Sequence, residues 1–203
     1  MSMRSKLKGR LLDAIFARYA GFFWAYRHWI DKGWPESYAS DESLRHPHRR
    51  LLLDAVSKFE PFDSLLEYGC GPGANLFLLA KKYPKAKFYG VDVSKVALEK
   101  ALKHPNIEYL TKRADWLQTD LFLTDACLIY KRAPWGIVDA IRSYGKGYIG
   151  CEWYDVKGTF QHGRHWVHNY RDWFPGCELR KLTWEDWQDE RWSTYGHIIT
   201  WRR

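Results

Sequence analysis

One short segment constrains the fold of this chain more than any other. An apolar run ends in the acidic residue Glu67, and three glycines follow at alternate positions, Gly69, Gly71 and Gly73. A helical apolar pattern over 74–83 begins immediately afterwards. This order predicts a strand, a tight turn and a helix. Glycine lets the main chain adopt positive φ and lets a ligand approach it closely, and open α/β sheets bind ligands at the carboxyl ends of their strands.

Strand and helix patterns alternate from this segment to the end of the chain. Strands are expected at about 63–68, 87–92, 107–110, 126–130, 147–152, 178–182 and 196–201, and helices at about 74–83, 94–103, 134–143 and 165–174. The alternation implies an α/β fold, in which a mostly parallel sheet is covered by helices on both faces.

The first 60 residues have a different pattern. Apolar residues recur every three or four positions over 7–31, which predicts an amphipathic helix interspersed with basic residues. Two interpretations remain open: the helix packs on the domain as a flank or lid, or it contacts a membrane surface or an acidic partner. A second helix is expected over 44–59. We therefore expect an N-terminal helical flank or lid over 1–60 and a single compact domain over 61–203.

Composition narrows the class of protein. A chain of 203 residues suits one domain with a sizeable core. The net charge of +8 permits nucleic acid, a membrane surface or an acidic small molecule as partner, without choosing among them. The 12 tryptophans belong to a core or line a pocket for a flat or sugar-like ligand. The four cysteines are scattered, which predicts reduced thiols. No apolar run is long enough to span a membrane, and charges interrupt the N-terminal apolar stretch. Together these features predict a cytoplasmic protein.

A second acidic residue supports a nucleoside-like ligand. Asp92 ends the second expected strand, 19 residues after Gly73, where a carboxylate can accept hydrogen bonds from ribose hydroxyls. NAD binders share that requirement. The segments LLEYGCGPG and FYGVDVS, with the strand and helix order over 45–203, resemble the class I S-adenosylmethionine-dependent methyltransferases. The resemblance implies a Rossmann-like seven-stranded sheet with a closing antiparallel strand, and S-adenosylmethionine as cofactor.

The resemblance also implies roles for matching residues. The residues around the methionine part of the cofactor would be Glu67, Gly69, Cys70, Gly71 and Gly73. Asp92 would bind the ribose, Val93 would flank the adenine, and Asp115 would accept a hydrogen bond from the adenine amino group. Trp116 would stack nearby, and Tyr130 would lie where the methyl group faces the acceptor. Structural alternatives stand beside three of these roles: Asp115 caps a turn, and Trp116 and Tyr130 pack in the core.

Methyl transfer to a hydroxyl requires a proton acceptor, and histidine titrates in a suitable range. Candidates follow the fifth expected strand: Glu152, His165 and His168. The two histidines stand three positions apart and share one face if the segment is helical. A solvated or structural role is the alternative for this cluster. No third ligand with suitable spacing appears, so no metal site is expected.

The methyl acceptor is expected to be a small molecule or glycan-like compound, methylated at oxygen. Basic residues that would receive an acidic acceptor are Arg49, Arg50, Lys131, Arg132 and Arg164, for which solvated surface is the alternative. A nucleic-acid methyltransferase is less favoured, because residues 130–135 lack the N/D-P-P-Y/F/W motif of enzymes that methylate base amines. An NAD(P) oxidoreductase and a non-catalytic cofactor-binding module are further alternatives. The sequence does not indicate an oligomeric state.

Overall fold

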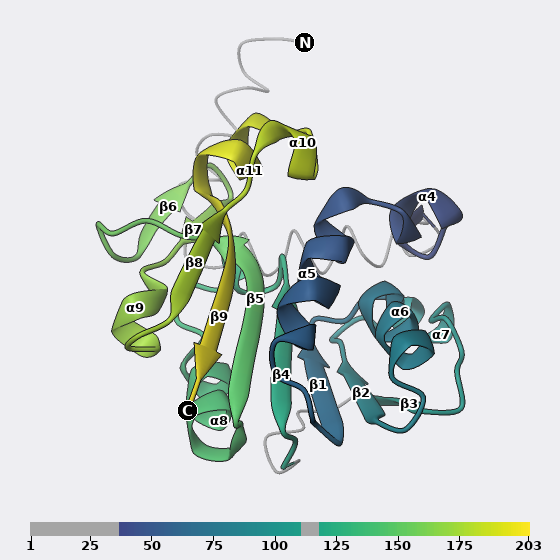
Figure 1. The fold of residues 1–203 in the computed structure, drawn as a ribbon. Helices are drawn as coiled ribbons and strands as arrows, with labels where there is room; N and C mark the ends of the chain where they lie inside the picture. Colours follow the sequence, from purple (N-terminus) through teal and green to yellow (C-terminus); the bar gives the residue numbers. More distant parts are fainter. Residues whose placement is uncertain (1–36, 111–117) are drawn as a thin grey trace, which may run out of the picture.

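The computed structural model describes residues 37–110 and 118–203 (Figure 1). The strands are β1 Ser64–Tyr68, β2 Lys87–Val91, β3 Ile107–Leu110, β4 Leu121–Asp125, β5 Gly147–Trp153, β6 Phe160–His162, β7 His165–Val167, β8 Glu178–Lys181 and β9 Gly196–Arg202. The helices are α4 Asp41–Leu44, α5 Pro47–Ser57, α6 Ala74–Lys82, α7 Lys95–Glu99, the 3-10 helix η1 Leu128–Tyr130, α8 Trp135–Tyr144, α9 Tyr170–Trp173, α10 Trp184–Trp187 and α11 Glu190–Tyr195. The helix expected over 7–31, Asp115 and Trp116 lie outside the described residues.

Seven strands form one sheet in the order β3-β2-β1-β4-β5-β9-β8. Strands β1 to β5 pair in parallel, whereas β9 runs antiparallel to both β5 and β8. This arrangement confirms the expected Rossmann-like sheet with a closing antiparallel strand. The chain moves outward from β1 to β3 and then returns to β4, beside β1. The strand order therefore reverses between β1 and β4, which is where such sheets form a ligand-binding crevice.

The central strands are apolar on both faces, so the sheet has two hydrophobic cores. Leu65 and Leu123 face one core, which helices α5 and α6 cover. Leu66, Phe122 and Tyr148 face the other core, which α8 and α9 cover. Successive side chains of a strand point to opposite faces, and the alternation of these residues follows that rule. Figure 1 shows α5 and α6 on one side of the sheet and α8 on the other.

The prediction of a fourth strand over 126–130 was wrong. The strand is β4, and it ends at Asp125. Ala126 has a φ of +50°, which interrupts the extended run. The main chain then turns into η1, whose first N–H groups donate to the buried carboxylate of Glu152. Residues 121–123 and 126–130 are both apolar, so periodicity alone did not distinguish them.

The helix expected over 165–174 was also wrong in its first half. Residues 160–167 form the antiparallel hairpin β6–β7, which places His162 opposite His165. Gly163, with a φ of +60°, lies in its turn. Only α9 is helical in this region, so His165 and His168 do not share a helix face. The helix expected over 94–103 ends earlier, at Glu99, although Ser94 caps it as a side-chain acceptor.

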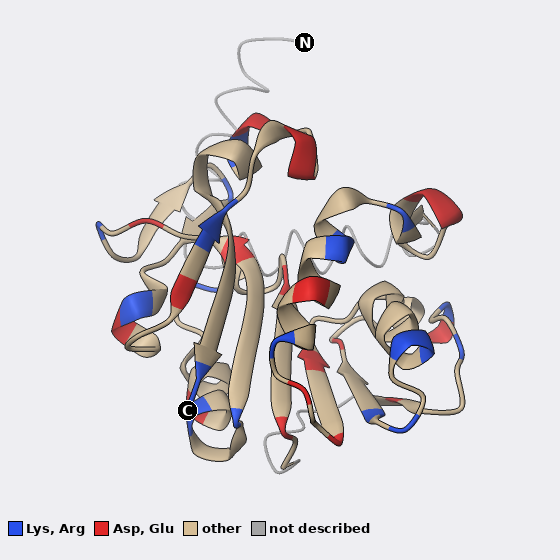
Figure 2. Cartoon of the chain, in the orientation of Figure 1, with Lys and Arg blue, Asp and Glu red and all other residues tan. Residues whose placement is uncertain are grey.

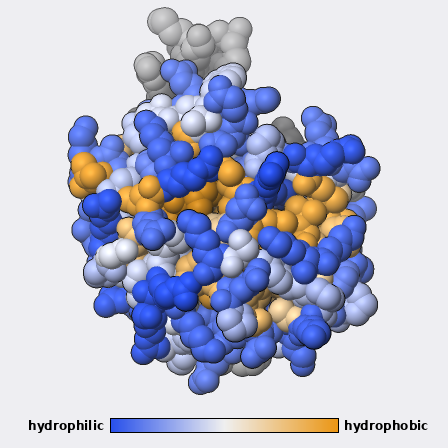
Figure 3. Space-filling view, viewed as in Figure 1, coloured by the Kyte–Doolittle hydropathy of each residue, from blue (hydrophilic) through white to orange (hydrophobic). Residues whose placement is uncertain are grey.

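The surface of the described part carries both charges and both polar and apolar patches. Basic and acidic residues are interspersed along the ribbon (Figure 2). Hydrophobic residues reach the face in Figure 3 as patches among hydrophilic ones. In residues 37–110 and 118–203, no helix combines the length and apolar character needed to cross a membrane.

Candidate functional site

The turn after β1 has the conformation that its glycines predict. Gly69, Gly71 and Gly73 have φ values of +71°, +52° and +76°, a region that residues with a side chain rarely adopt. A Cβ at Gly69 would lie 2.5 Å from the sulfur of Cys127, and one at Gly73 would clash with the hydroxyl of Tyr109. The turn therefore depends on glycine for both conformation and space.

Asp92, the residue after β2, is hydrogen-bonded to this turn. Its Oδ2 accepts from the N–H of Gly71 at 2.8 Å, and its Oδ1 accepts from the N–H of Ser94 at 2.7 Å. Burial raises the pKa of the carboxyl, and these two N–H groups oppose the rise. Each carboxylate oxygen has a further lone pair. Asp92 can therefore accept hydrogen bonds from a diol while it holds the turn against the end of β2.

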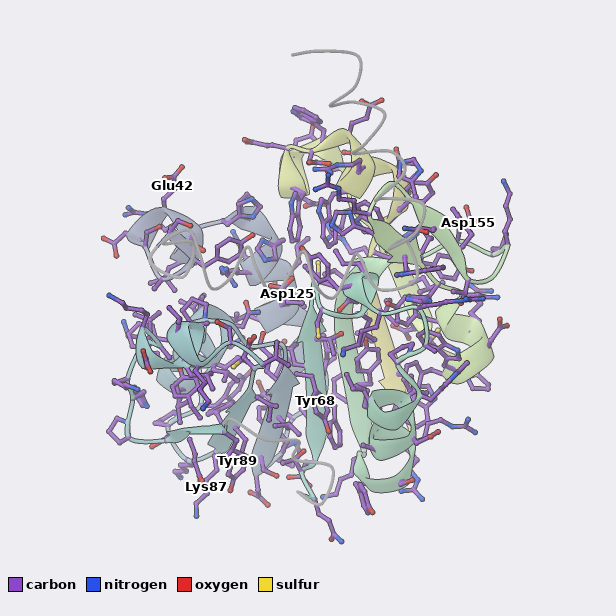
Figure 4. The ribbon with its side chains drawn as sticks, turned by 180° about the vertical axis from the view of Figure 1, so that it is seen from behind. Glu42, Tyr68, Lys87, Tyr89, Asp125 and Asp155 are labelled. Carbon is purple, nitrogen blue, oxygen red and sulfur yellow. The ribbon has the colours of Figure 1, made fainter. Side chains whose placement is uncertain are left out.

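A cavity of about 390 Å³ opens where the strand order reverses. One part of its wall consists of the glycine turn with Asp92 and Val93. Another part is aromatic and comes from elements far apart in the sequence; its side chains are Tyr38, His48, Tyr130 and Trp187. The cavity thus joins a glycine-rich region to an aromatic region. Figure 4 shows Asp125 at the centre of the molecule, at the end of β4 that adjoins this cavity.

Glu67 lies near the end of β1 and is 1% exposed. Its Oε1 accepts a hydrogen bond of 2.7 Å from the side-chain nitrogen of Asn75. Its Oε2 is buried and has no hydrogen-bond partner among the described residues. Burial raises the pKa of this carboxyl to about 8. A buried carboxyl with an unused oxygen, in the wall of a cavity, is suited to a cation or a hydrogen-bond donor.

Asp125 ends β4 and is the centre of a second group of polar side chains. Its Oδ2 lies 3.0 Å from Nε2 of His48, 3.0 Å from the side-chain nitrogen of Asn75 and 3.6 Å from the guanidinium of Arg49. These partners outweigh burial and lower the pKa of Asp125 to about 2. Arg49 also donates to Asn75 Oδ1 at 2.6 Å and to the carbonyl and hydroxyl oxygens of Ser43. A charged carboxylate is therefore present beside a histidine in the cavity wall.

The three residues predicted to be catalytic do not line this cavity. Glu152 is fully buried, and its oxygens accept from the main-chain N–H groups of Cys127, Leu128 and Ile129 at 3.0–3.3 Å. His168 is fully buried, with Nε2 3.2 Å from the carbonyl oxygen of Leu128. The ring of His165 packs on Tyr130 and Trp153 at centroid distances of 5.1 and 4.9 Å. Burial lowers the pKa of both histidines to about 4.

The other predicted site residues fall into three groups. Those that line the cavity are Glu67, Gly69, Cys70, Gly71, Asp92, Val93, Tyr130, Arg49 and Lys131. Gly73 shapes the turn without lining the cavity, and Arg50, Arg132 and Arg164 are exposed residues outside its wall. The sequence interpretation did not assign His48, Asn75 or Asp125 to the site. The signal for Asp125 was available, because Leu-Phe-Leu-Thr-Asp repeats the pattern of an apolar strand that ends in an acidic residue.

A family profile described as "Methyltransferase domain" matches residues 61–122. The chain is 34% identical over 94 residues to trans-aconitate 2-methyltransferase of Pseudomonas paraeruginosa. The aligned region covers 46% of this chain and 30% of that protein. It is 35% identical over 99 residues to tRNA (guanine-N(7)-)-methyltransferase of Chloroflexus aggregans, with 48% of this chain and 42% of that protein covered. The matches therefore span less than half of either relative.

Solved structures share the fold over more of the chain. Magnesium protoporphyrin IX methyltransferase from Synechocystis, with bound S-adenosylmethionine, aligns with a TM-score of 0.61 at 16% identity and covers 89% of this chain and 95% of that one. The O-methyltransferase of a Brevibacillus brevis polyketide multienzyme, in complex with S-adenosylhomocysteine, aligns with a TM-score of 0.60 at 12% identity, covering 83% and 77%. The profile match over residues 61–122 and the shared fold confirm the resemblance to class I methyltransferases.

Proposed function

We propose that this chain, a class I methyltransferase by motif and fold, transfers a methyl group from S-adenosylmethionine to a small-molecule acceptor, at oxygen. The observation that carries the proposal is the arrangement of the glycine turn, Asp92 and Glu67 around one cavity at the carboxyl ends of β1 and β2. The same cavity extends to an aromatic wall, which leaves space for an acceptor beside the donor.

The residues present fit this cofactor. Its methionine part carries an ammonium group, and Glu67 offers a buried carboxyl with an unused oxygen. Its ribose carries two hydroxyls, and Asp92 offers a carboxylate at the end of β2. The turn lines the cavity at Gly69 and Gly71, and both residues have positive φ. When bound, the cofactor supplies an electrophilic methyl group on a sulfonium, whereas the protein supplies binding, orientation and electrostatics.

Two observations support a small acceptor over a nucleic acid. Relatives and structural neighbours include enzymes named for trans-aconitate and magnesium protoporphyrin IX. Basic and acidic residues are interspersed on the described ribbon, whereas a single-strand-binding surface combines a continuous basic groove with aromatic residues (Figure 2). The relative named for tRNA keeps a nucleic-acid acceptor as the alternative to be tested.

Calorimetric titration with S-adenosylhomocysteine tests the donor half of the proposal. Asp92→Ala should weaken binding by about tenfold or more, since a hydrogen bond to a charged group contributes about 1.5–3 kcal/mol. Asp54→Ala, an exposed position on α5, is the matched control and should bind like the wild type. Unchanged affinity in Asp92→Ala would move the cofactor elsewhere.

A second experiment tests the acceptor class. Incubation with methyl-labelled cofactor, a small-molecule extract and, separately, total tRNA should give label in the small-molecule fraction alone. Labelled tRNA, or oligonucleotide binding that falls steeply with salt, would favour the nucleic-acid alternative. Tight cofactor binding with no labelled product in either fraction would favour a non-catalytic binding module.

A further inference from the structure

We infer that Trp187 and Tyr130 select the methyl acceptor by its shape: Trp187 contacts the face of a planar ring system, and the hydroxyl of Tyr130 donates a hydrogen bond to an oxygen on it. The inference rests on the proposed function and assigns residues to its acceptor side. Three features carry it: a chain of packed rings that joins the two residues, the polar side chains beside Trp187, and the hydroxyl of Tyr130.

A chain of packed rings reaches the cavity wall at both of its ends. At one end, Trp187 stacks on Trp192 with 3.7 Å between ring centroids and an interplanar angle of 11°. Trp192 contacts Trp153 at 5.9 Å, and Trp153 contacts His165 at 4.9 Å. At the other end, His165 contacts Tyr130 at 5.1 Å. Trp187 and Tyr130 line the cavity, whereas the tryptophans between them are buried, so both wall residues rest on one aromatic support.

The main chain around Trp187 is held as well. Trp187 ends α10, and the side chain of Asp186 accepts a hydrogen bond of 2.9 Å from the N–H group of Thr183, which closes the first turn of that helix. Its stacking partner Trp192 is on α11, which Asp189 caps through its side chain. A side chain fixed in this way loses little conformational freedom when a ligand binds, which favours binding.

The polar side chains beside Trp187 are engaged with one another. The ring of His48 lies 4.1 Å from that of Trp187 between centroids. Nε2 of His48 is 3.0 Å from Asp125, and Nδ1 is within hydrogen-bonding distance of Nδ1 of His46. Arg49 contacts the same carboxylate at 3.6 Å. A sugar would need hydrogen bonds from groups that already have partners, so the wall at Trp187 favours a ring with an apolar face.

The hydroxyl of Tyr130 differs from these groups, because no hydrogen bond joins it to another described residue. Burial raises the pKa of this hydroxyl above its ordinary value, and Tyr38 and Glu152 add to the rise. The hydroxyl therefore keeps its proton near pH 7 and can donate a hydrogen bond. Buried tyrosine hydroxyls usually have a partner. Tyr130 lines the cavity, so an oxygen on a bound ring system can be that partner.

The adenine of the cofactor is the other flat group to consider for these rings. Asp92 and Val93, the residues implied to hold the nucleoside, follow β2. In the sheet, β2 lies on one side of β1, whereas β4 and β5 lie on the other. Tyr130 follows β4, and Trp153 of the ring chain is on β5. The ring chain is therefore on the side of the sheet away from the nucleoside, which assigns it to the acceptor.

The test of Trp187 is equilibrium dialysis of 2-naphthol against the full chain saturated with S-adenosylhomocysteine. Decahydro-2-naphthol is the matched probe, because it has the same carbon skeleton and hydroxyl without a planar ring. The wild type should bind 2-naphthol about tenfold more tightly than the saturated probe. Trp187→Ala should lose most of that preference and should still bind S-adenosylhomocysteine like the wild type. Trp184→Ala, at an exposed position of the same helix outside the cavity wall, is the control and should keep the preference.

A second pair of probes tests the hydroxyl of Tyr130. Tyr130→Phe should weaken binding of 2-naphthol by about three- to tenfold, because one hydrogen bond is lost. Binding of naphthalene, which has no oxygen, should not change. Tyr144→Phe, at an exposed position outside the cavity wall, should bind both probes like the wild type. Equal weakening of the two probes in Tyr130→Phe would contradict the role of the hydroxyl.

The outcomes separate the inference from the function it rests on. If the wild type binds S-adenosylhomocysteine but does not prefer 2-naphthol to the saturated probe, or prefers a methyl glucoside, the inference is overturned and the proposed function stands. Equal losses of 2-naphthol and S-adenosylhomocysteine binding in Trp187→Ala would assign the ring to the cofactor and also overturn it. A wild type that does not bind S-adenosylhomocysteine would overturn the proposed function itself. Should Trp187→Ala fail to fold, Trp187→Leu keeps apolar bulk against Trp192 and should lose the same preference.

Discussion

Glu67 and Asp125, on the adjacent parallel strands β1 and β4, both accept a hydrogen bond from the side-chain nitrogen of Asn75, at 2.7 and 3.0 Å. The shared amide holds two carboxyl groups together at the point where the strand order reverses. Their environments differ: burial raises the pKa of Glu67 to about 8, and His48 and its neighbours lower that of Asp125 to about 2. Near pH 7 one carboxyl is therefore largely protonated and the other is charged.

Asn75→Ala should lower the free energy of unfolding by about 1–3 kcal/mol, because buried polar atoms of Glu67 and Arg49 lose a partner. Urea denaturation measures the change. Asn106→Ala removes an exposed side-chain bond to the carbonyl of Pro84 and should cost less. Equal losses in the two variants would show that the shared amide has no special role.

The stability of the protein should fall as pH rises toward 8. Burial raises the pKa of Glu67 from 4.5 to about 8, so between these values the folded state holds a proton that the unfolded state has released. The contribution of Glu67 is present in full below about pH 4.5 and is lost as pH rises through its folded pKa, by up to about 1.4 kcal/mol per unit.

Glu67→Gln should flatten this dependence, because glutamine does not titrate. Urea midpoints compared at pH 5.5 and pH 7.5 test it, with the exposed variant Glu108→Gln as control. A slope as steep in Glu67→Gln as in the wild type would place the linkage on another group; Glu152, whose pKa burial raises to about 7, would be the next to test.

Cofactor binding should release protons near pH 7. An ammonium group brought to the unused oxygen of Glu67 favours the charged carboxylate, so its pKa falls on binding. Calorimetric titrations in two buffers of different ionisation enthalpy measure the protons released, expected at about 0.5–1 per site. Binding of the cofactor by wild type without proton release would show that its ammonium lies away from Glu67.

Glu152→Ala should destabilise the fold by about 2–4 kcal/mol, because the main-chain N–H groups of Cys127, Leu128 and Ile129 lose their buried acceptor. The thermal midpoint should fall, and Glu152→Gln should restore part of the loss, since its amide oxygen still accepts. A variant that keeps wild-type stability yet loses methyl transfer would support the catalytic role that the sequence suggested for Glu152.

The sheet and the glycine turn with Asp92 could be predicted from the sequence because their signals are local. The glycines after Glu67 are best explained by a turn with positive φ, and Asp92 follows a strand at a fixed spacing from them. The order of strands and helices then specified the sheet.

The polar group around Asp125 could not be predicted because it is assembled from distant segments. His48 on α5 meets Asp125 at the end of β4 across 77 positions of sequence. The sequence suggested that the histidines near β7 form a cluster, but the turn at Gly163 makes a hairpin there. His165 is half-buried against Tyr130, and His168 is buried with its Nε2 beside the carbonyl oxygen of Leu128. The sequence thus showed which titratable residues are present, whereas their contacts depend on the tertiary fold.

Gly71→Arg tests the central claim most directly. Gly71 lines the cavity with a φ of +52°. Gly163 has a similar φ of +60°, and no atom lies within 4 Å of the position that its Cβ would occupy, so Gly163→Arg is a control with the same backbone strain. Calorimetric titration with S-adenosylmethionine should show binding to the wild type and to Gly163→Arg, and at least about 100-fold weaker binding to a folded Gly71→Arg. Wild-type affinity in Gly71→Arg would contradict the assignment of the glycine turn as the cofactor site.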